Sequence, residues 1–161
     1  VSAPGVETGQ VHRLDDATRS IFEARMALEV GVATLVAGIL DEEDFIAFRE
    51  LADKANSFIE GEKVTDLAGY ITANDAYHEF LFKRSGNDAM LQAYRNLEVP
   101  KAMDRELENE GFMHADIAKE HHEIIDALEA KDLTRVRELL EMHNTHAIET
   151  MTQVGAARTT A

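Results

Sequence analysis

The chain has 161 residues, a length that fits one domain with a sizeable hydrophobic core. Its formal net charge of −15 argues against a grip on the phosphate backbone of a nucleic acid, which needs clustered Lys and Arg. Cysteine is absent, which excludes disulfides, thiolate metal sites and cysteine nucleophiles and is compatible with a cytoplasmic protein.

The composition indicates a protein built from helices. Hydrophobic residues make up 45% of the chain and aromatic residues only 6%, a mix typical of aliphatic packing between helices. Apolar residues recur at helical spacing, and strand-like alternation is not sustained anywhere. The longest apolar run, residues 30–40, is too short to cross a bilayer, so no membrane contact is expected. The sequence therefore predicts an all-α protein.

The chain is predicted to begin with a linker and a buried helix. Residues 1–12 have no apolar periodicity and are read as the linker; because the chain opens with Val, we expect it to be part of a longer protein. A helix is predicted over residues 15–40, with Asp15 or Asp16 as its N-cap. It is apolar nearly all round after Val30, which favours a central position. Its inward face is expected to carry Ile21, Ala24, Leu28, Val32, Leu35, Val36 and Ile39.

Two further helices are predicted before the middle of the chain. One, capped by Asp41, should cover residues 42–60 and contribute only to the core. The next begins near Thr65 and ends at a Ser-Gly-Asn turn. In that turn Gly86 suits the left-handed position after a helix, and Asn87 can cap the helix that follows.

The second half of the chain predicts three more helices. The fourth helix should be kinked or split by Pro100, and the polar residues 101–111 are expected to be exposed, with a break near Gly111. A fifth helix is predicted over residues 115–130, and a sixth follows Asp132. The boundaries that result are a linker at 1–12, one domain at 13–155 and a flexible tail at 156–161.

Three of these helices carry residues that suit a metal ion. Asn74 and His78 are four residues apart and so lie on one helical face, while His121 and His143 lie on the apolar stripes of later helices. A single histidine on such a stripe is usually a core residue hydrogen-bonded to a neighbour. Three of them on three helices favour a divalent metal, with Zn²⁺ first and Ni²⁺, Fe²⁺ or Mn²⁺ as alternatives.

The ligand set has alternatives at two positions. Asp75, three residues before His78, is also within reach of the site and would bring a charge that an amide lacks. His146, one turn after His143, can replace it or support it from outside the ligand shell. The remaining candidates are expected at the surface: His114 and His122.

Arg25 and Glu29 interrupt the apolar face of the first helix at a spacing of four residues. Two readings stay open at this point. The pair can form an ion pair at the surface or half-buried, or Arg25 can point into a cavity and bind an anion.

Common enzyme motifs are absent from the sequence. There is no Gly-rich phosphate loop, no G-x-S-x-G and no H-E-x-x-H. No pair of buried carboxylates is evident for general acid–base work. We therefore expect a binding domain and not an enzyme.

The ordered motifs resemble those of the FCD domain, the C-terminal effector-binding domain of GntR-family transcription regulators of the FadR subfamily. The family's R-x-x-[IL]-E pattern corresponds to residues 25–29, and its [DN]-x-x-[FY]-H pattern and small-Gly-Asn turn correspond to residues 74–78 and 85–87. Its E-H-x-x-I-[IL]-x-A-[IL] pattern corresponds to residues 120–128, and a histidine follows eleven residues after Asp132. The resemblance covers nearly the whole chain.

The resemblance implies an antiparallel bundle of six to seven helices around a central cavity for a ligand and a metal. It implies a divalent metal bound by Asn74, His78, His121 and His143, beside a small organic acid whose carboxylate Arg25 binds. The family usually has Asp where this chain has Asn74, and an amide oxygen is a weaker, uncharged ligand.

The resemblance also implies a role in transcription. The chain would be the ligand-sensing and dimerisation domain of a bacterial regulator that works as a homodimer. DNA would be bound only through an N-terminal winged helix-turn-helix domain, which these residues do not include. The alternatives are a DinB-like helical-bundle metalloenzyme with a three-His metal site, and a plain dimerisation bundle with core histidines.

Overall fold

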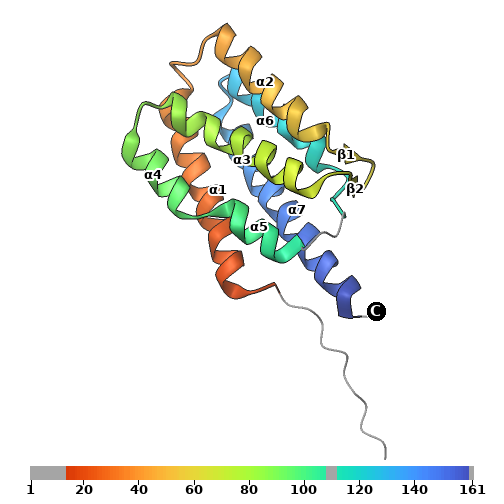
Figure 1. Cartoon of the computed structure of the whole chain (residues 1–161). Helices are drawn as coiled ribbons and strands as arrows, with labels where there is room; N and C mark the ends of the chain where they lie inside the picture. Colours follow the sequence, from red (N-terminus) through yellow and green to blue (C-terminus); the bar gives the residue numbers. More distant parts are fainter. Residues whose placement is uncertain (1–13, 108–111, 160–161) are drawn as a thin grey trace, which may run out of the picture.

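A computed structural model describes residues 14–107 and 112–159 (Figure 1). The predicted linker, residues 1–12, lies outside this described part. Apart from a two-stranded antiparallel hairpin, the regular structure is helical, so the predicted all-α fold is confirmed. The elements are α1 (Asp16–Val36), α2 (Glu42–Asn56), β1 (Ile59–Glu60), β2 (Lys63–Val64), α3 (Leu67–Arg84), α4 (Asp88–Asn96), α5 (Val99–Leu107), α6 (Ile117–Glu129) and α7 (Leu133–Thr159).

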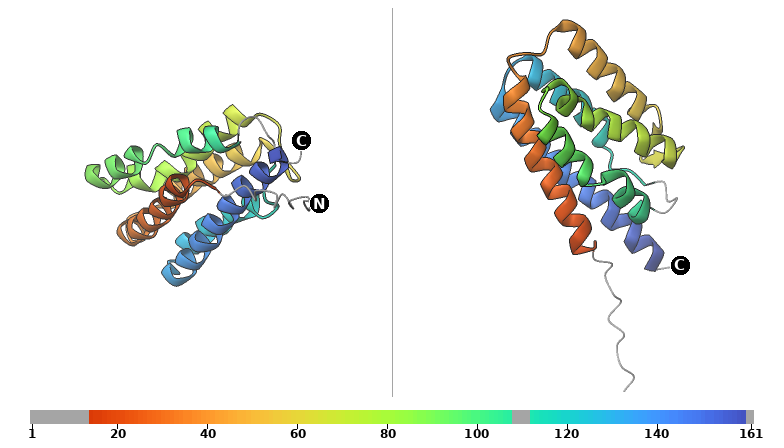
Figure 2. Two further views of the ribbon diagram at one scale, coloured as in Figure 1. Left: turned by 90° about the horizontal axis from the view of Figure 1, so that it is seen from below. Right: turned by 60° about the vertical axis from the view of Figure 1, so that its left-hand side comes forward.

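The helices pack as a bundle in which sequence-distant segments are neighbours. α7 contacts α1, α5 and α6, and α3 contacts α1, α2, α4 and α5. The two views of Figure 2 show α1 and α7 running side by side, with α2 and α3 on one side of them. Among the described helices, none is long and apolar enough to cross a membrane.

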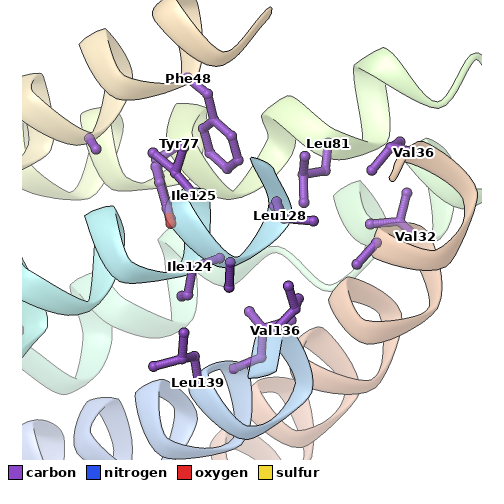
Figure 3. Close-up of a cluster of buried hydrophobic side chains, with 14 of the residues drawn as sticks. Val32, Val36, Phe48, Tyr77, Leu81, Ile124, Ile125, Leu128, Val136 and Leu139 are labelled. Carbon is purple, nitrogen blue, oxygen red and sulfur yellow. The ribbon is translucent and has the colours of Figure 1, made fainter. Parts of the chain in front are cut away.

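The interior consists of two apolar clusters. One includes Val32, Phe48, Tyr77, Leu81, Ile125, Leu128 and Val136, and Figure 3 shows their side chains converging from α1, α2, α3, α6 and α7. The other includes Phe22, Tyr70, Met103, Ile117 and Met151. Buried polar residues lie between these two groups along each of four helices: Arg25 and Glu29 on α1, Asn74 and His78 on α3, Glu120 and His121 on α6, and His143 on α7. A polar layer therefore crosses the middle of the bundle.

The helix ends follow the capping signals in the sequence. The Asp15 carboxylate accepts from Ala17 N–H at 3.2 Å, and Asp41 forms a capping box with Asp44. Asn87 Oδ1 accepts from Met90 N–H at 3.0 Å at the start of α4. These caps confirm the predicted starts of three helices.

The predicted inward face of α1 was partly wrong. Leu35 and Ile39 are 49% and 57% exposed, and α1 ends at Val36 and not at residue 40. The buried face instead carries Thr18, Phe22, Arg25, Glu29, Val32, Ala33 and Val36. The two charged residues lie on this inward face because they belong to the polar layer, so apolarity alone indicated the wrong stripe.

α2 also ends earlier than predicted. α2 ends at Asn56, and residues 59–60 pair with residues 63–64 in an antiparallel ladder. Gly61 turns this hairpin with a φ of +63°. Strands of two residues are too short to show the alternation by which strands are recognised in a sequence.

The region around Pro100 is helical on both sides of a break. α4 ends at Asn96, Glu98 has a left-handed φ of 50°, and α5 starts at Val99, so the predicted split is confirmed. Proline is tolerated there because the first turn of a helix has unpaired N–H groups. The expected exposure of residues 101–111 was wrong in part, since α5 buries Ala102, Met103, Glu106 and Leu107.

The C-terminal helices match the prediction except at their ends. α6 spans residues 117–129 against an expected 115–130, and Asp132 Oδ1 accepts from Arg135 N–H at 3.0 Å at the start of α7. α7 continues to Thr159, beyond the point at which the sequence predicted a loose tail. The expected break near Gly111 lies outside the described residues.

Candidate metal centre

Three of the predicted ligands come together in the polar layer. His78 on α3, His121 on α6 and His143 on α7 are 3%, 0% and 3% exposed. One ring nitrogen from each lies within 4.8 Å of those of the other two, and the ring centroids are 5.0 to 6.1 Å apart. The three histidines are therefore close enough to share one ion.

Each of the three rings is held by an oxygen on its Nδ1 side. Nδ1 of His78 bonds to Glu29 Oε1, and Nδ1 of His143 lies 2.8 Å from Glu120 Oε2. Nδ1 of His121 lies 2.8 Å from Asn56 Oδ1, whose amide is oriented because its Nδ2 donates to Ala118 O. Carboxylate and amide oxygens accept hydrogen bonds, so Nδ1 carries the proton and the lone pair resides on Nε2.

Among the described residues, the buried Nε2 atoms of His78 and His121 have no hydrogen-bond partner. A buried polar atom without a partner costs about 1–3 kcal/mol. A divalent ion would satisfy both atoms at once, and this arrangement of oxygen, imidazole and metal is common in metalloproteins. The residues present therefore fit a metal ion.

The electrostatics keep these rings neutral. Burial lowers the pKa of His78 well below 6.5, and the charges of Arg25 and His143 lower it further. Burial also lowers the pKa of His121 well below 6.5, with a further contribution from His143. A metal binds neutral imidazole, so these two ligands need lose no proton at neutral pH.

Glu120 joins two histidines. Its Oε2 accepts from His143 and its Oε1 accepts from Nδ1 of His146. Burial alone would raise the pKa of Glu120, but the hydrogen bonds and charges of the two rings bring it below 4.5. The carboxylate is therefore ionised. His146 lies outside the cluster of three rings and is connected to His143 through Glu120.

Asn74 and Asp75 point to different surroundings. Asn74 is 3% exposed; its Oδ1 accepts from Tyr70 Oη at 3.3 Å, and its Nδ2 lies 3.7 Å from Met103 Sδ. An amide oxygen has a second lone pair, so this contact leaves room for a metal. Asp75 accepts from Tyr94 Oη on α4 at 2.7 Å and is not among the clustered donors of the described residues. The role of Asn74 as fourth ligand remains a prediction.

Arg25 is buried in the same layer. It is 2% exposed, its guanidinium lies 4.7 Å from the centroid of the Phe22 ring, and its Nε is 3.9 Å from Glu29 Oε2. Within the part of the chain that the structure describes, its Nε has no hydrogen-bond partner. The ion pair read from the sequence thus exists, but it is internal and not at the surface, and it leaves Nε without a hydrogen bond to a described residue.

A second group of possible ligands contains His114, His146 and Glu149. The His114 and His146 rings stack face to face, 3.9 Å apart and tilted by 8°. Nδ1 of His114 accepts from Asp116 N–H at 3.2 Å, so its Nε2 carries the proton and has no lone pair for a metal. Stacked rings also direct their lone pairs along parallel lines, so we do not assign a metal to this group.

Two further comparisons with the sequence predictions concern His122 and the oxygen atoms that hold the three rings. His122 has a side chain that is 36% exposed and pairs with Asp53 at 2.8 Å, in agreement with its predicted surface position. Sequence reasoning missed the oxygens that hold the rings, on Asn56, Glu29 and Glu120. Glu29 and Glu120 lie inside the quoted motifs, which was a signal, whereas nothing marked Asn56.

The described surface hollows are lined by other residues. One of about 630 Å³ is bounded by α1 and α7, and one of about 210 Å³ lies at the α4–α5 junction beside Asp75 and Tyr94. The three rings are enclosed by the bundle. The expected central cavity remains a prediction.

Comparisons with known proteins identify the family. The FCD domain family matches residues 20–146, which include all three clustered histidines. A solved GntR structure from Streptococcus agalactiae is similar in fold, with a TM-score of 0.64 and 24% identity over 92% of this chain. The chain spans 66% of that protein. No curated protein matches it. With most of its length matched, the chain belongs to the FCD domain family.

Proposed function

We propose that this domain is the ligand-sensing and dimerisation part of a bacterial GntR-family transcription regulator, acting in the cytoplasm and without catalysis. The family match and the likeness to a GntR structure support this role. The net charge of −15 fits a domain that leaves DNA to an N-terminal winged helix-turn-helix. In a homodimer, ligand binding would change helix packing and thereby the spacing of the two DNA readers.

The proposed site holds Zn²⁺ between His78, His121 and His143, with Asn74 as the fourth ligand; Ni²⁺, Fe²⁺ and Mn²⁺ are alternatives. The single observation that carries this proposal is the pair of buried, unpartnered Nε2 atoms on His78 and His121. When bound, the ion would act as a Lewis acid that attracts a carboxylate oxygen.

The proposed effector is a small carboxylic acid. Arg25 supports this assignment because its guanidinium is buried and its Nε lacks an acceptor. A carboxylate accepts two hydrogen bonds from one guanidinium, which gives both affinity and orientation. Arg25 would therefore bind the acid beside the metal.

A sensor fits these residues better than the metalloenzyme alternative. A hydrolytic metal site needs a general base near the ion. In the described part of the chain, the two buried carboxylates that touch the histidine cluster, Glu29 and Glu120, accept from ring N–H groups. Each of them already accepts a hydrogen bond from a candidate ligand, which suits a role in orienting the rings.

The test is a Zn²⁺ titration against a chromophoric chelator. The wild-type chain should bind one equivalent of Zn²⁺, and His78→Ala should lower the affinity by about 100-fold or more, because it removes a ligand. His122→Ala is the matched control, since this histidine is on the same bundle but is half-buried, lies outside the cluster and pairs with Asp53. Equal affinity in the wild type and His78→Ala would refute the metal site.

A further inference from the structure

Glu29 contacts both halves of the proposed site. Its Oε1 accepts from Nδ1 of His78, and its Oε2 lies 3.9 Å from Nε of Arg25. Glu29 is 4% exposed, so water screens neither contact. One buried anion therefore lies between a candidate metal ligand and the candidate effector anchor.

The contact with Arg25 is the weaker of the two. At 3.9 Å it is too long for a hydrogen bond, and Nε of Arg25 forms no hydrogen bond with any described residue. The contact with His78 is a direct hydrogen bond through the proton of Nδ1. An added carboxylate can thus take Arg25 from Glu29 without disturbing the bond to His78.

If a ligand carboxylate replaces Glu29 as the partner of Arg25, the net charge next to His78 changes. While Arg25 faces Glu29, its positive charge offsets part of the negative charge of the carboxylate, because the two groups are 3.9 Å apart in the interior. An acid bound to Arg25 would neutralise the guanidinium and leave the whole negative charge of Glu29 on the Nδ1 side of His78. Negative charge there makes Nε2 a stronger donor to a metal.

We propose that Glu29 couples the two ligands, so that a carboxylate bound at Arg25 tightens metal binding at His78. By reciprocity, bound metal tightens the carboxylate by the same factor. The inference rests on the proposed function, because it needs both a metal and an anion in the polar layer. It adds that the metal is a responsive part of the sensor and not a fixed structural ion.

The experiment measures the Zn²⁺ dissociation constant of the full chain at neutral pH, in sodium acetate and in sodium chloride of equal ionic strength. In the wild type, acetate should tighten Zn²⁺ binding by about fivefold or more, the lower range of coupling between sites. In Glu29→Gln, which keeps the shape and the acceptor but removes the charge, the factor should fall below about twofold. The acetate dissociation constant, measured with and without Zn²⁺, should change by the same factor.

Two further variants separate this coupling from other causes. Glu120→Gln is the matched control, because Glu120 holds the ring of His143 and its described partners are histidines. It should weaken Zn²⁺ binding and keep the acetate factor. Arg25→Met should abolish the acetate factor while binding Zn²⁺ at least as tightly as the wild type, and it tests the same coupling if Glu29→Gln does not fold.

The outcomes distinguish the inference from the proposed function. Zn²⁺ binding with an equal acetate factor in the wild type, Glu29→Gln and Arg25→Met would show that acetate reaches the metal directly, and would overturn the coupling alone. Zn²⁺ binding without any acetate factor in the wild type would do the same. Absence of Zn²⁺ binding in the wild type would overturn the proposed metal site and the coupling with it.

Discussion

His78 and His121 are neutral in the folded chain, and this makes stability depend on pH. Burial lowers the pKa of both rings well below 6.5, whereas both rings regain ordinary pKa values on unfolding. Below pH 6.5 the unfolded chain therefore binds protons that the folded chain refuses, and stability falls as the pH falls. In chelator, the free energy of unfolding should drop by about 1 kcal/mol per histidine between roughly pH 7.5 and 5.5.

Urea unfolding across this pH range measures the effect. Burial raises the pKa of Glu29, which works in the opposite direction because the folded chain then takes up a proton as the pH falls. His78→Asn should remove about half of the dependence, while His122→Asn, a change at a half-buried ring near the surface, should leave it intact. Equal profiles in the wild type and His78→Asn would show that the ring of His78 is not neutral and buried.

Asn74 is the residue at which the charge of the site can be changed most directly. Asn74→Asp should tighten Zn²⁺ binding by about tenfold or more, because a carboxylate adds a negative charge at the ion. The same change should destabilise the metal-free chain, since an unpaired buried carboxylate is costly. Chelator competition measures the first effect and urea unfolding the second.

Asp75→Asn is the matched control for this change. Asp75 bonds to Tyr94 on α4, so removal of its charge should leave Zn²⁺ affinity nearly unchanged. The reverse result, a loss of metal in Asp75→Asn and no gain in Asn74→Asp, would make Asp75 the ligand.

The sequence predicted the histidines of this site better than the residues that hold them. His78, His121 and His143 could be placed because helical spacing fixes which side of a helix a residue faces. The contact of Asn56 with His121 joins residues 65 positions apart and depends on how α2 and α6 are rotated against each other. Periodicity carries no information about that rotation.

At the scale of elements, Gly86 follows α3 in a left-handed backbone conformation that is unfavourable for residues with a side chain. Its φ is +64°, and an added Cβ would meet nothing within 4 Å, so only the backbone conformation opposes a side chain. Gly86→Ala should lower the free energy of unfolding by about 1–2 kcal/mol. Chemical denaturation at neutral pH measures this loss.

Gly38 is the matched position for that test. It also has open space around its Cα, but it has no left-handed φ. Gly38→Ala should be neutral or stabilise the chain by up to about 1 kcal/mol, because alanine restricts the unfolded state. Equal effects at both positions would mean that backbone conformation does not determine the cost at Gly86.

Helix ends could be predicted from the sequence where the capping signal is local. The buried face of a helix could not be predicted where the core contains polar residues. Asp41 and Asn87 cap their helices through side-chain contacts within three residues, which the sequence displays directly. Leu35 is apolar but 49% exposed, whereas Arg25 is charged but buried. The polar layer thus inverts the pattern on which the prediction of α1 relied, because it places charged side chains in the interior.

At the scale of the whole molecule, the polar layer divides the core, and a metal bound in this layer would stabilise the fold. His78, His121 and His143 come from three helices, so one ion would connect α3, α6 and α7. Without an ion, the Nε2 atoms of His78 and His121 have no hydrogen-bond partner among the described residues between the two apolar clusters. A ligand that binds only the folded chain stabilises it by mass action.

This linkage gives the last prediction. Free Zn²⁺ at about 100 times its dissociation constant should add about 2.7 kcal/mol, which for a domain of this size raises Tm by roughly 5–10 °C. Thermal melts followed by circular dichroism should show this rise, its reversal on chelation and its absence in His78→Ala. A bundle that binds no metal would not be stabilised by Zn²⁺. An unchanged Tm would therefore favour the alternative in which the three histidines are ordinary core residues. A rise that persists in His78→Ala would instead place the ion elsewhere on the chain.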